Sequence, residues 1–234
     1  MIVENRDGER LGVLKDFIVD MPAGDIKYAL VSAGGVLGVR STRKIVPVQA
    51  ISDATAKAGI LALDVSTRRW KKAPLFRRSE LRKLTQPQRA GEISSFYFPV
   101  AQRSQPPQAD PNGRQAAPSA TGREDALHGP PSYELASDII GRDVFNQQQK
   151  AVGKVSDLLI DLAGAKKPFS IISRARLLQK GENYAVPLQL LKQSPDHRLK
   201  IEANGASLTQ AQPFNEQTWQ TTAASSASIY RYSE

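Results

Sequence analysis

The sequence lacks several residue types on which common activities depend. None of its 234 residues is cysteine, which excludes disulfide bonds, a thiol nucleophile and thiolate metal sites. The only two histidines are His128 and His197, so we expect neither a multi-histidine metal site nor histidine-based acid–base catalysis. No apolar run approaches the ~20 residues that span a bilayer. These gaps favour a soluble protein that is not an enzyme and that uses no metal or other cofactor.

The composition otherwise suits one or two small globular domains, with 40% apolar and 6% aromatic residues. The chain begins Met-Ile-Val-Glu-Asn-Arg-Asp, which is not the pattern of a signal peptide. The default expectation is therefore the cytoplasm, unless a leader has been lost before Met1.

The two ends of the chain share a series of landmarks in the same order. The run GVLKDFIVD at 12–20 matches GKVSDLLID at 153–161, which aligns Gly12, Asp16 and Asp20 with Gly153, Asp157 and Asp161. Further landmarks are Val-Pro-Val-Gln at 46–49 and Val-Pro-Leu-Gln at 186–189, extended runs at 60–65 and 198–203, and Ala-Pro-Leu-Phe at 73–76 echoed by Ala-Gln-Pro-Phe at 211–214. Their nearly constant spacing predicts two homologous domains of roughly 75–80 residues each.

Each copy is expected to consist of short strands separated by turns. Ile18 to Gly24 is an example, because a β-rich run leads into Pro22 and Gly24, which favour a turn. Many short strands at this spacing predict a small antiparallel barrel, with short helices only at the ends of the repeats.

These motifs resemble the PRC-barrel domain, which occurs in the photosynthetic reaction-centre H subunit and in the ribosome-maturation factor RimM. The resemblance rests on the G-x-[LV]-x-D-[FL]-[IL]-[VI]-D run, the Gly-Gly-Val-Leu-Gly turn at 34–38, the Val-Pro pairs, and the Ala-Pro-x-Phe that follows a short helix at 66–72. It covers about 2–76 and 134–214 and is nearest to bacterial tandem PRC-barrel proteins. It implies small β-barrels that mediate protein contacts, with no catalytic motif. The second copy departs from the pattern at 173–176, where Ser-Arg-Ala-Arg stands in place of the glycine-rich turn.

The expected fold is mainly β, with two small antiparallel PRC-type barrels, short helices and a flexible linker. The expected parts are a first barrel (1–78), a basic amphipathic helical extension (79–98), a flexible linker (99–132), a second barrel (133–215) and a disordered tail (216–234). The repeat aligns Met1 with Arg142, so the first copy has no counterpart of 137–141 and a sheet edge is left unpaired. A strand at 229–232 is one candidate to cover that edge.

The positive charge is concentrated after the first barrel. The formal net charge is +9, and residues 68–98 hold nine basic and two acidic side chains. The candidate binding residues are Arg68, Arg69, Trp70, Lys71, Lys72, Arg77, Arg78, Arg82 and Lys83. One interpretation is a solvated face on a helix that starts near Pro87 and packs its apolar stripe of Ile93, Phe96 and Tyr97 onto the barrel. The other is a surface for an anionic partner: an acidic protein, RNA or anionic lipid headgroups.

The repeated aspartates also have two interpretations. Paired carboxylates can bind a cation or act as an acid–base pair. Aspartates at strand ends more often accept backbone N–H bonds, and we favour that structural role for Asp16, Asp20, Asp157 and Asp161.

Three functional hypotheses follow from the sequence. The first is a non-enzymatic interaction or assembly module, in which the barrels pack about a pseudo-twofold axis within the chain or the chain forms a homodimer. The second is an RNA- or ribosome-associated maturation factor that uses the basic segment at 68–83. The third, suggested only by the resemblance to the H subunit, is an accessory of a photosynthetic complex.

Overall fold

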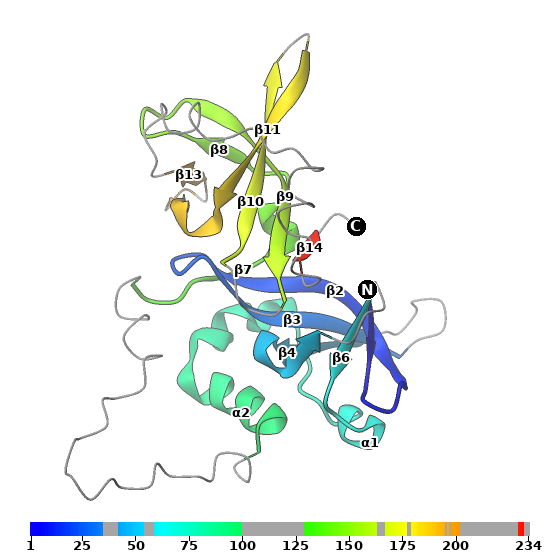
Figure 1. The fold of residues 1–234 in the computed structure, drawn as a ribbon. Helices are drawn as coiled ribbons and strands as arrows, with labels where there is room; N and C mark the ends of the chain where they lie inside the picture. The colour runs from blue at the N-terminus through cyan, green and yellow to red at the C-terminus, as the bar shows by residue number, and fades with distance from the viewer. Residues whose placement is uncertain are drawn as a thin grey trace, which may run out of the picture.

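Two β-sheets, one from each copy of the repeat, form the body of the protein (Figure 1). The computed structural model describes residues 1–34, 42–53, 59–99, 129–162, 167–176, 179–194, 196, 198–201 and 229–231. The first copy and its extension contain β1 (Ile2–Glu4), β2 (Arg10–Asp20), β3 (Asp25–Ala33), β4 (Thr42–Pro47), η1 (Val48–Ala50), β5 (Ile51–Asp53), β6 (Ile60–Leu63), α1 (Thr67–Trp70), η2 (Arg78–Thr85) and α2 (Pro87–Tyr97). The second half contains β7 (Tyr133–Leu135), α4 (Ala136–Ile139), β8 (Asp143–Phe145), β9 (Ala151–Asp161), β10 (Phe169–Arg176), β11 (Gln179–Pro187), η4 (Leu188–Leu190), β12 (Leu191–Gln193), β13 (Leu199–Ile201) and β14 (Ile229–Arg231).

The two sheets have the same strand order, which supports the repeat seen in the sequence. The first runs β4-β3-β2-β1-β6-β5, and the second runs β11-β10-β9-β8-β13-β12. In the second copy, β10 and β11 form a long hairpin whose ladder extends to Arg176 and Gln179.

The prediction of closed antiparallel barrels is wrong in two respects. β1 pairs with β6, and β8 with β13, in parallel, so both sheets are mixed. Each sheet also begins and ends on strands that are neighbours in sequence, separated only by η1 or η4, and no ladder joins these end strands within the described residues. The parallel pairs arise because β1 and β6, like β8 and β13, are joined by a crossover through the intervening strands rather than by a hairpin. The spacing of short strands along a sequence does not distinguish a crossover from a hairpin.

A glycine at the same place in each copy allows neighbouring strands to approach closely. A Cβ on Gly12 would lie 2.3 Å from the carbonyl oxygen of Ser32, and one on Gly153 would lie 2.7 Å from that of Ser173. Neither distance is possible for a real side chain without a shift of the backbone. The glycine of the repeated motif is therefore required for packing.

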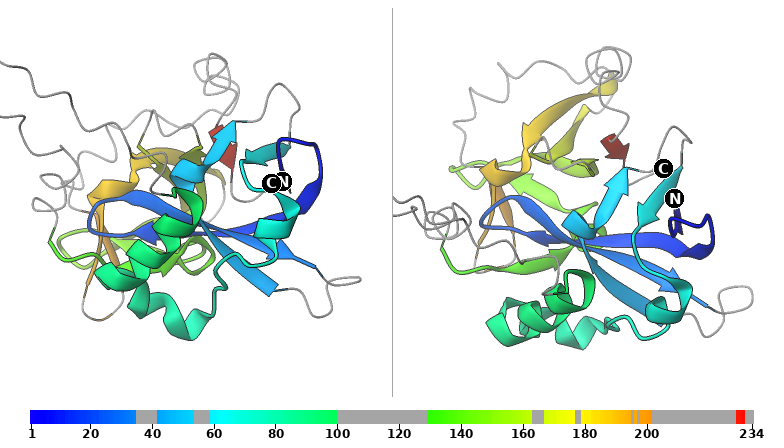
Figure 2. Two further views of the ribbon diagram at one scale, coloured as in Figure 1. Left: turned by 90° about the horizontal axis from the view of Figure 1, so that it is seen from below. Right: turned by 60° about the horizontal axis from the view of Figure 1, so that its bottom comes forward.

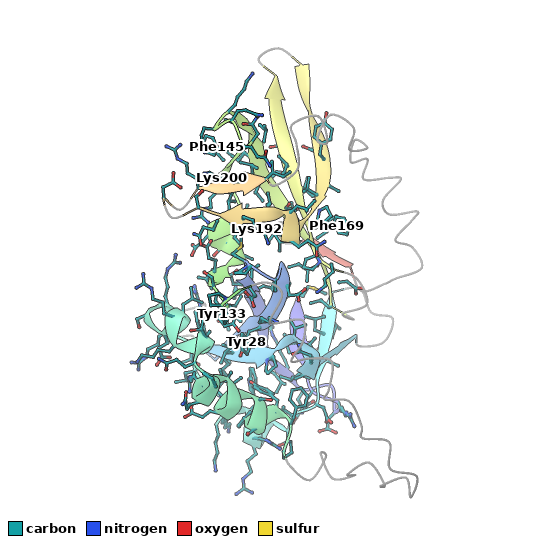
Figure 3. The ribbon with its side chains drawn as sticks, turned by 90° about the vertical axis from the view of Figure 1, so that its left-hand side faces the viewer. Tyr28, Tyr133, Phe145, Phe169, Lys192 and Lys200 are labelled. Carbon is teal, nitrogen blue, oxygen red and sulfur yellow. The ribbon has the colours of Figure 1, made fainter. Side chains whose placement is uncertain are left out.

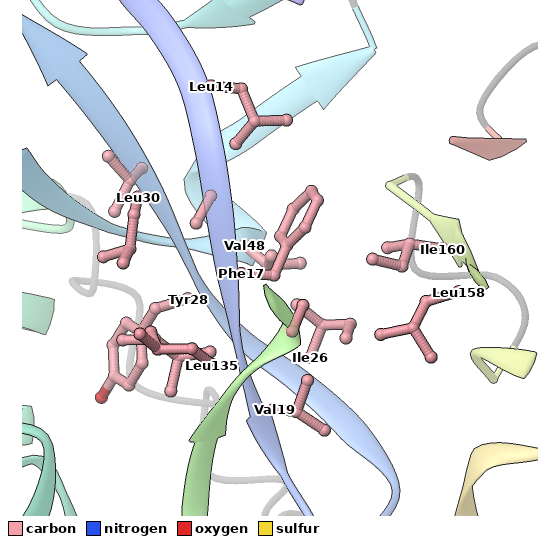
Figure 4. Packing of buried hydrophobic residues seen from close by; sticks show 14 of the residues in the cluster. Leu14, Phe17, Val19, Ile26, Tyr28, Leu30, Val48, Leu135, Leu158 and Ile160 are labelled. Atoms are coloured by element: carbon pink, nitrogen blue, oxygen red, sulfur yellow. The ribbon is translucent and has the colours of Figure 1, made fainter. Parts of the chain in front are cut away.

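The two copies share one hydrophobic core. Phe17 and Val19 on β2 point toward Leu158 and Ile160 on β9 (Figure 4). These are equivalent positions of the repeat, and contact between equivalent positions is what packing about a pseudo-twofold axis produces. The copies therefore pack on one another within the chain.

The strand that opens the second half pairs with the sheet of the first copy. β7 runs antiparallel to the end of β2, with Leu135 opposite Ile18 and Tyr133 opposite Asp20. The adjoining helix α4 is fastened by Ser137, whose backbone N–H and hydroxyl both donate to the carboxylate of Asp16. A backbone ladder thus interlocks the two copies in addition to their shared core.

The turn between β2 and β3 contacts the second copy directly. Gly24 has φ +65°, and a Cβ there would lie 2.4 Å from the backbone nitrogen of Gln189 in η4. The ammonium of Lys192 donates to the Pro22 carbonyl at 3.1 Å, and Lys167 pairs with Asp25 at 2.8 Å. Nearby, the rings of Tyr28 and Tyr133 meet edge to face at 6.2 Å between centroids (Figure 3).

The C-terminal residues differ from the prediction. Part of the segment expected to be disordered, Ile229–Arg231, forms β14, and it pairs with β9 of the second copy rather than with the first copy. An available sheet edge orders a segment whose surrounding Ser- and Thr-rich composition predicts no structure. The predictions for Gly35 to Gly38, His128, His197, residues 211–214 and the linker from 100 to 128 concern residues outside those described.

Candidate binding surface

Three helical segments at and after the end of the first copy, α1, η2 and α2, carry most of the excess positive charge. α1 is capped by Ser66, whose hydroxyl oxygen accepts the backbone N–H of Arg69 at 3.4 Å. α2 begins with Pro87 in its first turn, as predicted, and buries Ile93 and Tyr97. Figures 1 and 2 show α1 and α2 on the side of the first sheet that faces away from the second copy.

Trp70 anchors α1 to the first sheet. Its side chain is 4% exposed, and its indole N–H donates to the carbonyl of Leu11 at 2.8 Å. The ammonium of Lys44 lies 5.4 Å from the indole centroid and donates to the carbonyls of Lys71 and Ala73, while burial lowers its pKa. Trp70 therefore belongs to the core and does not present its ring to a partner, unlike the basic residues with which the sequence analysis grouped it.

Tyr97 on α2 makes part of the stability dependent on pH. Its hydroxyl donates to the Ile45 carbonyl at 2.9 Å, and burial raises the pKa of the phenol above its usual value of 10.0. The fold thus favours the neutral phenol, so this contribution is intact below pH 10 and is lost as the pH rises further. We expect the free energy of unfolding to fall by up to about 1.4 kcal/mol per pH unit above pH 10 from this group.

Urea unfolding at pH 9, 10 and 11 measures this dependence. Tyr97→Phe should make the decline shallower. Burial also raises the pKa of Tyr28, so Tyr28→Phe shows how much of the decline a second tyrosine supplies. An equal slope for the parent and Tyr97→Phe would contradict the assignment.

Six basic residues form what we call the basic surface. They are Arg68, Lys71, Lys72, Arg77, Arg82 and Lys83, all exposed, and none has an ion pair with another described residue. The two carboxylates of this segment, Glu80 and Glu92, both pair with Arg89, at 3.9 and 3.0 Å. The charge of the basic surface is therefore not neutralised by its own segment.

The other two predicted cations are held by neighbours. The guanidinium of Arg69 lies 5.0 Å over the ring of Phe96 and donates to the backbone carbonyl of that residue. Arg78 donates to Asp138 on α4 at 2.5 Å, and this bond raises the pKa of Arg78. These two arginines contribute to the packing of the extension as well as to its charge.

A cleft of about 670 Å³ lies where η2 meets the start of the second half. Charged residues in its lining are Arg78, Arg82, Glu134, Asp138 and Arg142. Arg142 pairs with Glu134 at 2.5 Å, as Arg78 does with Asp138. Of the three arginines in the lining, Arg82 is the one without an ion pair among the described residues. Its charge is available to an acidic group that enters the cleft beside the basic surface.

Two of the four repeated aspartates, Asp16 and Asp157, accept backbone N–H bonds, which is the structural role favoured from the sequence. Asp16 accepts the N–H of Phe17 at 2.8 Å in addition to both bonds from Ser137, and Asp157 accepts the N–H of Leu158 at 2.8 Å. Within the described residues, no three histidine, aspartate or glutamate side chains gather in a way that could hold a metal ion. Every helix in the described part of the chain is too short or too polar to cross a membrane.

Two mixed sheets of identical strand order, packed through equivalent faces, define a tandem β-domain protein. The family model of the PRC-barrel domain matches residues 1–68 and 131–208. These segments make up more than half of the chain, and the chain belongs to the PRC-barrel family. No curated protein matches it in sequence.

The sequence analysis missed the crossing of β7 from one copy to the other. The second family match begins at residue 131 and so includes β7, which the structure places in the first sheet. Residues 133–135 carry no signal in the sequence that marks this pairing.

Proposed function

We propose that this protein is a non-enzymatic interaction module that binds an acidic protein partner on its basic surface. The observation that carries the proposal is the set of six exposed cations with no ion pair among the described residues, beside carboxylates that are already paired with Arg89. An acidic partner would supply the missing countercharge, and such complementarity raises both the rate and the specificity of association.

The interlocked copies support this proposal, because they provide a rigid base for the surface. Trp70 fixes α1 to β2, Tyr97 fixes α2 to β4, and the ion pair of Arg78 with Asp138 joins η2 to α4. A base that is already ordered lowers the conformational cost of binding.

RNA is the alternative partner, and the burial of Trp70 disfavours it. Single-stranded nucleic acid is commonly held by basic groups together with exposed aromatic rings on which bases stack. In this segment Trp70 lies in the core and Phe96 is covered by Arg69. Charge alone remains to attract phosphates, which predicts weak RNA binding with a steep dependence on salt.

Binding titrations with a fluorescent 20-residue polyglutamate and a 20-nucleotide single-stranded RNA test the proposal. The test variant carries Arg68→Ser, Lys71→Ser, Lys72→Ser and Arg77→Ser. We expect it to bind polyglutamate at least tenfold more weakly than the parent. The matched control removes the same charge from exposed sites elsewhere, with Arg10→Ser, Lys15→Ser, Lys150→Ser and Lys154→Ser, and should lose no more than threefold.

Equal losses in both variants would show a response to net charge only and would refute a localised surface. RNA bound more tightly than polyglutamate, with log K falling against log salt at a slope of about −3.5 for five phosphates neutralised on a single strand, would favour the nucleic-acid alternative.

A further inference from the structure

The two sheets receive an extra strand at the same place. β7 pairs with Ile18 to Asp20 at the end of β2, and β14 pairs with Leu159 to Asp161 at the end of β9. These segments of β2 and β9 are equivalent in the repeat, and the registers also agree: Tyr133 lies opposite Asp20, and Ile229 lies opposite Asp161. The added strand of the second sheet is thus β14, near the C-terminus, and the added strand of the first sheet is β7, at the start of the second half.

The residues that follow the two strands are alike as well. β7 continues into Ala-Ser-Asp at 136–138, and β14 is followed in the sequence by Tyr-Ser-Glu at 232–234. In a sequence alignment that extends the common register, Ser233 is aligned with Ser137. In the first copy that serine satisfies the buried Asp16, and Asp157 is the equivalent, equally buried aspartate of the second copy.

We propose that the edge of β9 at residues 159–161 is a peptide-binding site for a short extended segment that is followed by a serine and an acidic residue. The chain's own C-terminal segment occupies it, and the same segment of a second copy binds there when the edge is left open. Recognition combines the antiparallel backbone ladder with a hydrogen bond from the serine to Asp157, as in the pair of Ser137 and Asp16. This site does not depend on the basic surface, which lies on the first copy's extension.

The length of the connection explains why the chain fills its own site. Between β13 and β14 lie residues 202–228, a connector of 27 residues. This covalent link keeps β14 near the edge of its own β9 and gives it there an effective concentration far above micromolar. A competing peptide at micromolar concentration therefore binds only when the native segment is removed or weakened.

A truncation and a peptide test the site. A fluorescent peptide of residues 226–234 should bind a chain that ends at residue 228 at least tenfold more tightly than it binds the full chain. The peptide with Ser233→Ala should bind the truncated chain several-fold more weakly, and a scrambled peptide should not bind. Equal binding to both chains, or no binding to a truncated chain that retains its circular dichroism spectrum, would overturn the proposal.

A second measurement uses the full chain and avoids truncation. Because the protein has no cysteine, the pair Leu159→Cys and Arg231→Cys, which lie opposite each other, introduces the only two thiols. Oxidation at micromolar protein concentration should give a monomeric disulfide, and refolding at millimolar concentration before oxidation should give a fraction of linked dimer. The control pair Leu159→Cys and Lys150→Cys should form no bond within the monomer, and failure of the first pair to link at either concentration would refute the assignment.

Discussion

Replacement of Gly24 by alanine is expected to destabilise the protein by roughly 3 kcal/mol or more, since two penalties combine. The backbone at Gly24 has φ +65°, which a residue with a Cβ adopts at a cost. The new methyl group would also lie 2.4 Å from the backbone of Gln189 in the second copy, so the two copies would have to move apart. Urea denaturation of the full chain measures the loss as a lower midpoint.

The chain offers a matched control for this substitution. Gly34 has φ +73°, but a Cβ there meets no atom within 4 Å. Gly34→Ala should therefore show the conformational penalty alone, about 1 kcal/mol. The excess loss in Gly24→Ala is the contribution of contact between the copies, and equal losses at the two positions would mean that this contact does not stabilise the fold.

Replacement of Trp70 by alanine is expected to cost about 3–5 kcal/mol. The substitution leaves a cavity between α1 and β2, removes the indole N–H bond to Leu11, and deprives the Lys44 ammonium of the ring beside it. Thermal unfolding followed by circular dichroism should show the loss. Binding to the basic surface should weaken as well, because α1 is held to the sheet by this residue.

Trp70→Phe separates the two effects. It keeps most of the packing and removes the donor, so it should cost markedly less than Trp70→Ala, with about 1–3 kcal/mol from the unsatisfied Leu11 carbonyl. If Trp70→Ala unfolds at the parent's temperature, the assignment of Trp70 to the core is incorrect.

The sequence was sufficient for the parts of the fold that are local or repeated. The offset between Gly12 and Gly153 revealed the two copies, and both glycines prove to stand where a strand passes too close for a side chain. The turn at Pro22 to Gly24 and the start of α2 at Pro87 also follow from local backbone preferences. The turn and the helix start depend on residues that are near in sequence, and the repeat is visible because the same motif occurs twice.

The features that sequence reasoning could not supply depend on distant pairing. Nothing in the run Ile229–Arg231 indicates that it pairs with β9, and nothing in Tyr133–Leu135 indicates that it pairs with β2 rather than with its own copy. The same is true of the candidate surface. Composition located the positive charge. Only the structure shows that Trp70 is part of the core, that Arg69 and Arg89 contact neighbouring residues, and that six other cations are exposed and unpaired among the described residues.

The pairing of β7 with β2 also sets an order of events during synthesis. When the ribosome has released the first copy, the end of β2 still lacks its neighbour, and Asp16 still lacks Ser137. Both arrive only after the intervening segment and residues 133–139 have been translated. The nascent first copy therefore has an unpaired strand edge until β7 of the second half has been synthesised. A translational pause before β7 would prolong the exposure of that edge to other chains.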